Sequence, residues 1–74
     1  MKTNIKLLKW RREHREYYML RLEGFVGKSK KETMESWLSE NCSFNWDLYY
    51  APYKRSYCAF ENETDAMAFK LRWL

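Results

Sequence analysis

Apolar and polar residues alternate most clearly in residues 44–50, which read F-N-W-D-L-Y-Y. An apolar side chain at every second position is the pattern of a strand with one buried face. The next five residues, 51–55, are mostly polar and contain Pro52, which presets φ for a turn. Residues 56–60 then complete a predicted antiparallel hairpin.

A helix is predicted before this hairpin, because Met34, Trp37 and Leu38 recur at helical spacing. Ser29 followed by Glu32 fits a capping box, in which the two residues satisfy each other's free backbone N–H groups. We therefore expect this helix to start at Ser29, after an entry loop.

A second helix is predicted after the hairpin. Asn62 is a favoured N-cap residue, and Asp65 lies in the first turn, where the helix dipole favours a negative charge. Ala66, Phe69 and Trp73 then fall on one side. This side is expected to pack against the sheet.

The N-terminal third is open to two interpretations. Residues 4–11 and 16–23 each show an alternation that predicts a strand, with a polar turn at residues 12–15. One long helix from Ile5 to Leu22 is the alternative, because Lys, Arg, Glu and Leu are good helix formers. The pair Tyr17-Tyr18 favours the hairpin, since aromatic residues are enriched in strands.

With the hairpin, the predicted order of elements is β-β-α-β-β-α. Short turns imply antiparallel pairing, and two helices with one apolar side each imply that both lie on one face of the sheet. The predicted fold is a two-layer α+β sandwich. The 74 residues hold only two Gly and one Pro and no linker, so residues 1–74 are expected to form a single domain.

The second face of this sheet would be left open. Alternation places Tyr17, Met19, Arg21 and Tyr49 on it. Aromatic residues, Met and Arg are enriched in the centres of protein interfaces, and a domain of this size gains stability from a partner. These four residues are therefore the predicted protein-binding surface, for another protein or for a second copy in a homodimer.

Basic residues gather at the N-terminus. Residues 1–15 contain six Lys or Arg and one Glu, whereas residues 16–74 contain eight basic and nine acidic side chains. Such a basic segment suits nucleic acid, an acidic protein or anionic lipid, or is simply a solvated edge strand. Aromatic residues interleave with the cations, as in proteins that bind single-stranded or structured nucleic acid. The alternative nucleic-acid-binding residues are Lys9, Trp10, Arg11, Arg12, Arg15, Lys54 and Arg55.

The sequence contains no catalytic signature. His14 is the only histidine, and Cys42 and Cys58 are not spaced as metal ligands, so both are expected to be free thiols. No glycine-rich phosphate loop is present. We expect no enzymatic activity, no cofactor and no metal. Residues 1–5 begin no apolar run, so a cytoplasmic protein without a membrane anchor is expected.

The C-terminal third has an aromatic strand, the acidic stretch Glu63 to Asp65, and then Phe69-Lys70-Leu71-Arg72-Trp73. This ending resembles that of small proteins encoded by tailed bacteriophages. The resemblance implies a helix docked on a hairpin, and a non-enzymatic protein that binds a host or viral protein in the host cytoplasm, either blocking or redirecting it. It assigns a role to no single residue.

Overall fold

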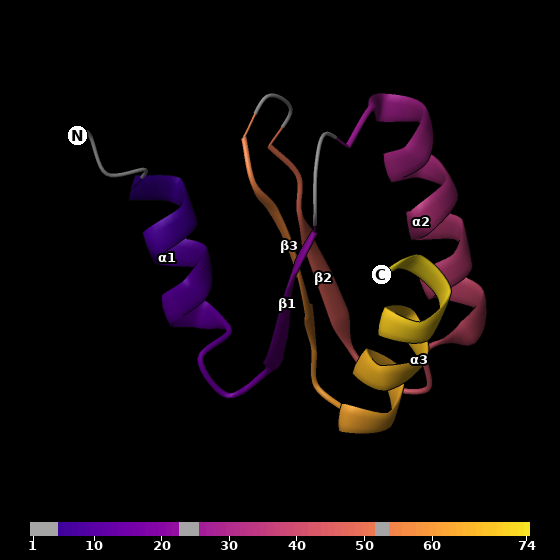
Figure 1. Cartoon of the computed structure of the whole chain (residues 1–74). Coiled ribbons are helices and arrows are strands. Elements are labelled where there is room, and N and C mark those ends of the chain that lie inside the picture. Colours follow the sequence, from indigo (N-terminus) through magenta and orange to yellow (C-terminus); the bar gives the residue numbers. More distant parts are fainter. Residues whose placement is uncertain (1–4, 23–25, 52–53) are drawn as a thin grey trace.

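The computed structural model describes residues 5–22, 26–51 and 54–74. Within them it has three helices and three strands (Figure 1). In chain order these are α1 (Ile5–Glu13), β1 (Tyr18–Leu22), α2 (Lys28–Asn41), β2 (Trp46–Tyr49), β3 (Ser56–Phe60) and α3 (Glu63–Trp73).

The strands form one antiparallel sheet in the order β1-β3-β2. Strand β3 is central, and its Cys58 is opposite Leu20 of β1 and Leu48 of β2. Every residue of β3 is buried. Because strand side chains alternate between faces, Leu20, Leu48 and Cys58 share one face of the sheet, and their neighbours in sequence share the other.

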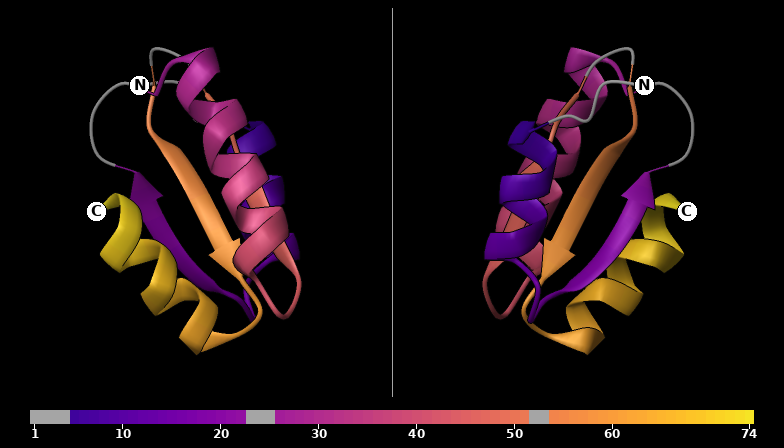
Figure 2. Two further views of the ribbon diagram at one scale, coloured as in Figure 1. Left: turned by 90° about the vertical axis from the view of Figure 1, so that its right-hand side faces the viewer. Right: turned by 90° about the vertical axis from the view of Figure 1, so that its left-hand side faces the viewer.

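Helices α2 and α3 cover the first of these faces, as Figure 2 shows. Leu38 of α2, Phe60 of β3 and Phe69 of α3 are fully buried there. The rings of Phe60 and Phe69 lie 5.2 Å apart, and Trp37 packs at the margin, 6.0 Å from Phe69. The predicted two-layer α+β arrangement, with an antiparallel sheet and two helices on one face, is confirmed.

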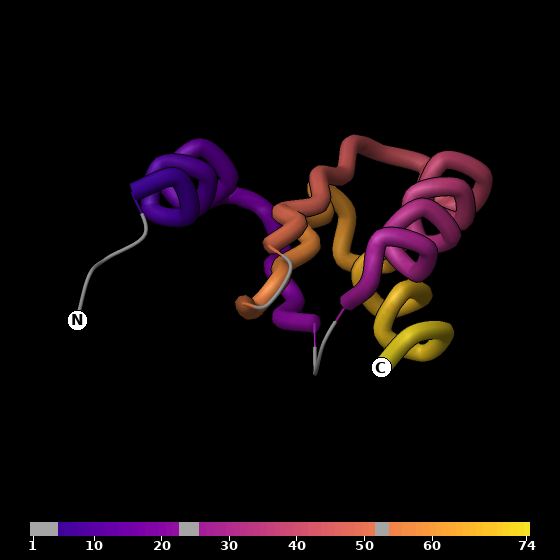
Figure 3. The backbone as a smooth tube through the Cα atoms, turned by 90° about the horizontal axis from the view of Figure 1, so that it is seen from above, coloured from indigo at the N-terminus to yellow at the C-terminus, as the bar shows by residue number. Residues whose placement is uncertain are grey.

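The predicted first strand is wrong, because residues 5–11 form most of helix α1. Lys, Arg and Leu dominate this segment, and their helix propensity prevails over a weak alternation. The long-helix alternative is right only as far as Glu13, since β1 begins at Tyr18. Figures 1 and 3 show α1 against the other face of the sheet.

One carboxylate of β2 holds α1 in this position. Asp47 Oδ2 accepts a hydrogen bond from Trp10 Nε1 at 3.0 Å and lies 3.0 Å from His14 Nε2. The ring of Trp10 also packs 5.7 Å from that of Tyr49, and the Arg11 guanidinium lies 4.5 Å above the ring of Tyr57 in β3. Helix α1 therefore covers β2 and β3.

The two other helices begin differently from each other. Asn62 caps α3 as predicted, since its Oδ1 accepts hydrogen bonds from Thr64 N at 2.9 Å and Asp65 N at 3.3 Å. The predicted capping box of α2 is wrong. This helix begins at Lys28 with Gly27 as its N-cap, so Ser29 already lies inside the first turn, and no side chain of the described residues caps this start.

Asp65 has a structural role that its sequence position did not indicate. It is only 6 % exposed, and its Oδ2 accepts hydrogen bonds from Ser43 N and Phe44 N, both at 3.1 Å. The carboxylate thus ties the first turn of α3 to the loop that enters β2. Hydrogen bonds to a charged acceptor are stronger than neutral ones.

We expect Asp65→Ala to lower the free energy of unfolding by about 1–3 kcal/mol, because two backbone N–H groups lose their acceptor. Glu63→Ala is the matched control, since it removes the same charge from the same turn at an exposed position. Chemical denaturation of both variants measures the difference. Equal stability of the two variants would contradict the role assigned to Asp65.

Asp47→Ala should loosen α1 without unfolding the sheet, because it removes the acceptor shared by Trp10 and His14. We expect amide exchange in Ile5–Glu13 to become about tenfold faster, as for the loss of a hydrogen bond worth about 1.4 kcal/mol. Glu13→Ala, on the exposed side of the same helix, serves as the control. Unchanged exchange in α1 would show that Asp47 does not anchor it.

Candidate protein-binding edge

The single histidine is part of the α1 anchor. His14 Nδ1 lies 2.7 Å from the carbonyl oxygen of Trp10, and Nε2 faces Asp47 Oδ2. The side chain is only 13 % exposed. Both ring nitrogens therefore face acceptors within the protein. Among the described residues, no three His, Cys, Asp or Glu side chains group so that they could hold a metal ion.

Both cysteines are free thiols, as predicted. Burial, together with the nearby Asp65 carboxylate, raises the pKa of Cys42 to about 11. Burial also raises the pKa of Cys58, and its neighbours Cys42 and Asp47 raise it further. Because the thiolate is the reactive form of cysteine, neither side chain is poised as a nucleophile at neutral pH.

The sheet face predicted to be open is partly covered by α1, which corrects that expectation. Tyr49 lies under Trp10, and the ring of Tyr17 packs edge-on against His14 at 5.0 Å. Met19 is half-buried and Arg21 is exposed, both on β1. The four predicted protein-binding residues therefore do not form one exposed surface.

The alternative nucleic-acid-binding residues are also divided. Trp10 is a half-buried residue of α1, and its side chain holds the helix to the sheet. Arg11 lies over the ring of Tyr57. Lys9 is 4.0 Å from Glu13 and Arg15 is 3.8 Å from Glu16, in exposed pairs. The remaining three, Arg12, Lys54 and Arg55, are exposed.

The outer edge of β1 offers backbone hydrogen-bonding groups. Glu61 lies just after β3, and Asn45 lies just before β2. They form a hydrogen-bonded pair, because Glu61 N donates to Asn45 O at 2.9 Å. In an antiparallel ladder such pairs alternate. Ala59 and Tyr57 therefore bond to β2, while Phe60, Cys58 and Ser56 bond to β1.

This alternation decides the direction of the groups on β1. Tyr18 and Leu20 are opposite Phe60 and Cys58, so their N–H and C=O groups point to β3. Those of Met19 point away from the sheet. In residues 5–22, 26–51 and 54–74, no other backbone group bonds to Met19.

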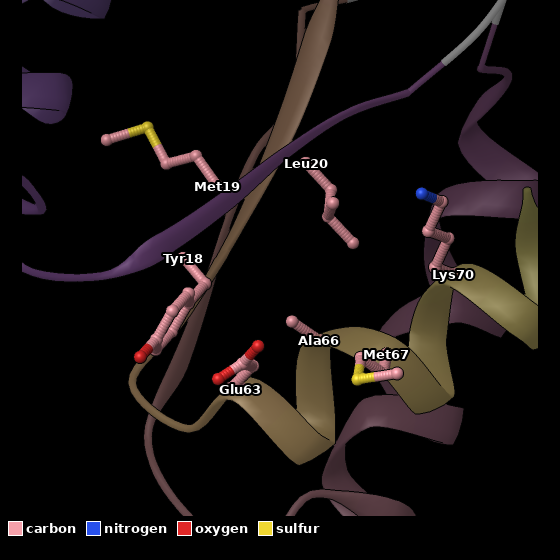
Figure 4. Close-up of a pocket in the computed structure, with 7 residues that line it drawn as sticks. All are labelled: Tyr18, Met19, Leu20, Glu63, Ala66, Met67 and Lys70. Atoms are coloured by element: carbon pink, nitrogen blue, oxygen red, sulfur yellow. The ribbon is translucent and has the colours of Figure 1, made fainter.

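A groove lies beside this edge, between β1 and α3. It is open to solvent and has a volume of about 250 Å³. Figure 4 shows Tyr18 and Leu20 pointing from β1 toward α3, and Met19 pointing to the opposite face. The groove is lined by Tyr18, Met19, Leu20, Glu63, Ala66, Met67 and Lys70. We call it the β1–α3 groove.

Large apolar side chains are exposed around the groove. Of the lining residues, Met67 is 59 % exposed and Tyr18 is 48 % exposed. Leu71, four residues after Met67 on α3, is 88 % exposed. Single exposed apolar residues are common on protein surfaces, but a group of them beside a cavity is typical of a binding site. The sequence carried one signal of this surface, since Met67 and Leu71 are spaced i, i+4 outside the predicted buried side of the last helix.

Comparison of the chain with protein families, with characterised proteins and with solved structures finds no match. No helix among the described residues is long and apolar enough to cross a bilayer.

Proposed function

We propose that this chain is a non-enzymatic protein-binding domain that accepts an extended segment of a partner as an added strand beside β1. The observation that carries the proposal is the outward N–H and C=O of Met19 next to the β1–α3 groove. In strand addition, main-chain hydrogen bonds supply affinity, and pockets for alternate side chains supply specificity. The β1 edge and the groove offer both.

The opposite edge of the sheet is less suited to this role. Leu48 N–H already donates to Asp47 Oδ1 at 2.9 Å. The same carboxylate holds α1 through Trp10 and His14. An edge amide with its own acceptor is a poor template for another strand, which leaves β1 as the edge for binding.

The resemblance of the C-terminal third to small phage proteins adds a biological setting to the proposal. In that setting the partner is a host or viral protein in the host cytoplasm, and occupation of the groove blocks or redirects it. Binding of a short segment of the partner beside β1 is enough for such an effect. While it is bound here, that segment cannot contact its usual binding partner.

A proline at position 19 tests the proposal. Proline removes the outward N–H of Met19 and is tolerated in an edge strand where that group faces solvent. Peptides selected from a random display library on the wild-type protein should bind Met19→Pro at least about tenfold more weakly, a loss of about 1.4 kcal/mol or more.

Met19→Val is the control, since it changes the side chain but keeps the N–H. It should retain binding, and thermal melting should show both variants folded. If Met19→Pro binds the selected peptides as tightly as the wild type, strand addition at β1 is excluded.

Nucleic-acid binding is the second candidate, and one observation favours it. Lys6 and Arg12 of α1 are exposed and have no ion-pair partner among the described residues. Lys54 and Arg55, before β3, are exposed as well. Figure 1 places the start of α1 and the start of β3 toward the same end of the sheet.

For this candidate, affinity for a labelled single-stranded oligonucleotide should fall with salt, with a log–log slope of about −0.7 for each phosphate contact. Reversing Lys6 and Arg12 to Glu should make the slope shallower by about 1.4, as for two lost contacts. Lys28→Glu together with Lys30→Glu, at two exposed positions on α2, makes the same change in net charge and is the control. Absence of binding by the wild type at low ionic strength would remove this candidate.

A further inference from the structure

Opposite charges stand at the two ends of the β1–α3 groove. Glu63 and Lys70 both line it from α3 and are both exposed. Neither has an ion-pair partner among the described residues. Figure 4 shows Ala66 and Met67 between them, and Glu63 near Tyr18. The groove therefore has an apolar middle, an acidic end and a basic end.

These features identify the occupant, and the inference rests on the proposed function. We infer that the groove binds an extended segment in which an acidic and a basic residue flank one apolar residue at alternate positions. The apolar side chain enters between Leu20 and Ala66. The acidic side chain pairs with Lys70, and the basic one pairs with Glu63.

The spacing of the charges fits such a segment. Glu63 and Lys70 are seven residues apart, which is about 10.5 Å along a helix. Two strand residues on one face, four positions apart, are about 13 Å apart. The difference of about 3 Å is within the reach of flexible Lys and Glu side chains. Residues only two positions apart, at about 6.7 Å, fit less closely, because the difference is then about 4 Å.

The direction of the segment follows from that of β1. This strand starts at Tyr18, near Glu63, and runs to Leu22. Antiparallel pairing is slightly more stable than parallel pairing. An antiparallel segment passes Lys70 first and Glu63 last. The segment therefore reads acidic, apolar, basic from its N-terminus, with one residue between each pair.

A second copy of the chain fits this site less well. Figure 2 shows α3 beside β1 on the outer side of the sheet. Pairing β1 with the β1 of a second copy about a twofold axis would bring the two α3 helices to the same face. The second α3 would then have to pack next to the first, since packed helices need 8–10 Å between axes. A single segment without its own helix has no such requirement.

Two peptides of equal composition test the inference. The first is acetyl-Thr-Asp-Thr-Leu-Thr-Lys-Thr-amide, and the second exchanges its Asp and Lys. The wild-type protein should bind the first peptide about tenfold more tightly, which corresponds to about 1.4 kcal/mol. Fluorescence anisotropy of labelled peptides measures both affinities.

A charge-swapped protein makes the test sharper. The double variant Glu63→Lys and Lys70→Glu should prefer the second peptide by a similar factor. Lys30→Glu with Glu32→Lys, at exposed positions on α2, keeps the same net charge and should keep the preference of the wild type. Persistence of the wild-type preference in the swapped protein would overturn the inference.

Failure of the inference is distinguishable from failure of the proposed function. If both peptides bind equally well and Met19→Pro abolishes both interactions, strand addition stands and the assignment of charges is overturned. If neither peptide binds, this chemistry of the occupant is overturned, while the library selection on Met19→Pro still decides the proposed function. If binding survives Met19→Pro, the site is not the β1 edge.

Discussion

Strand β3 forms backbone hydrogen bonds with β1 on one side and with β2 on the other, and the rest of the structure depends on this constraint. Its residues alternate in the direction of their backbone groups, so Ala59 and Tyr57 bond to β2 while Cys58 and Phe60 bond to β1. The same alternation in β1 directs the N–H and C=O of Met19 outward. The register of a buried strand therefore determines which backbone groups remain for a partner.

The side chains of the sheet follow the same alternation. The face that carries Cys58 and Phe60 is covered by α2 and α3, and this packing forms the core. On the other face, the Asp47 carboxylate contacts the side chains of Trp10 and His14 and thereby holds α1 over β2 and β3. Strand β1 is first in the order β1-β3-β2, so it is an edge of the sheet, and α3 packs against it on the core side.

The sequence was sufficient where local signals and packing agree. Residues 44–50 alternate, and β2 forms within them with Trp46 and Leu48 packed against the core. Asn62 caps α3 with its own side chain. Residues 5–11 were wrongly predicted to be a strand, because their weak alternation is also compatible with a helix. The position of this helix depends on Asp47, more than thirty residues away. Ser29 failed as a cap because the helix starts at Lys28, which is set by backbone geometry at Gly27.

The candidate site was less accessible from the sequence than the fold. The predicted protein-binding residues shared a face by alternation, but Tyr17 and Tyr49 are contacted by α1, which was predicted to be a strand. Only the order β1-β3-β2 makes β1 an edge, and strand order comes from long-range pairing. Met67 and Leu71 were recognisable as apolar residues off the buried side of α3, but the position of Met67 in a groove beside β1 was not.

Amide hydrogen exchange at Met19, measured by NMR, tests most directly whether β1 is an open, usable edge. In the free protein, the Met19 amide should exchange much faster than that of Leu20, whose N–H points to β3. Saturation with the peptide acetyl-Thr-Asp-Thr-Leu-Thr-Lys-Thr-amide should slow exchange at Met19 toward the rate at Leu20. An amide already protected at Met19 in the free protein, or unchanged when the peptide is bound, would contradict the account.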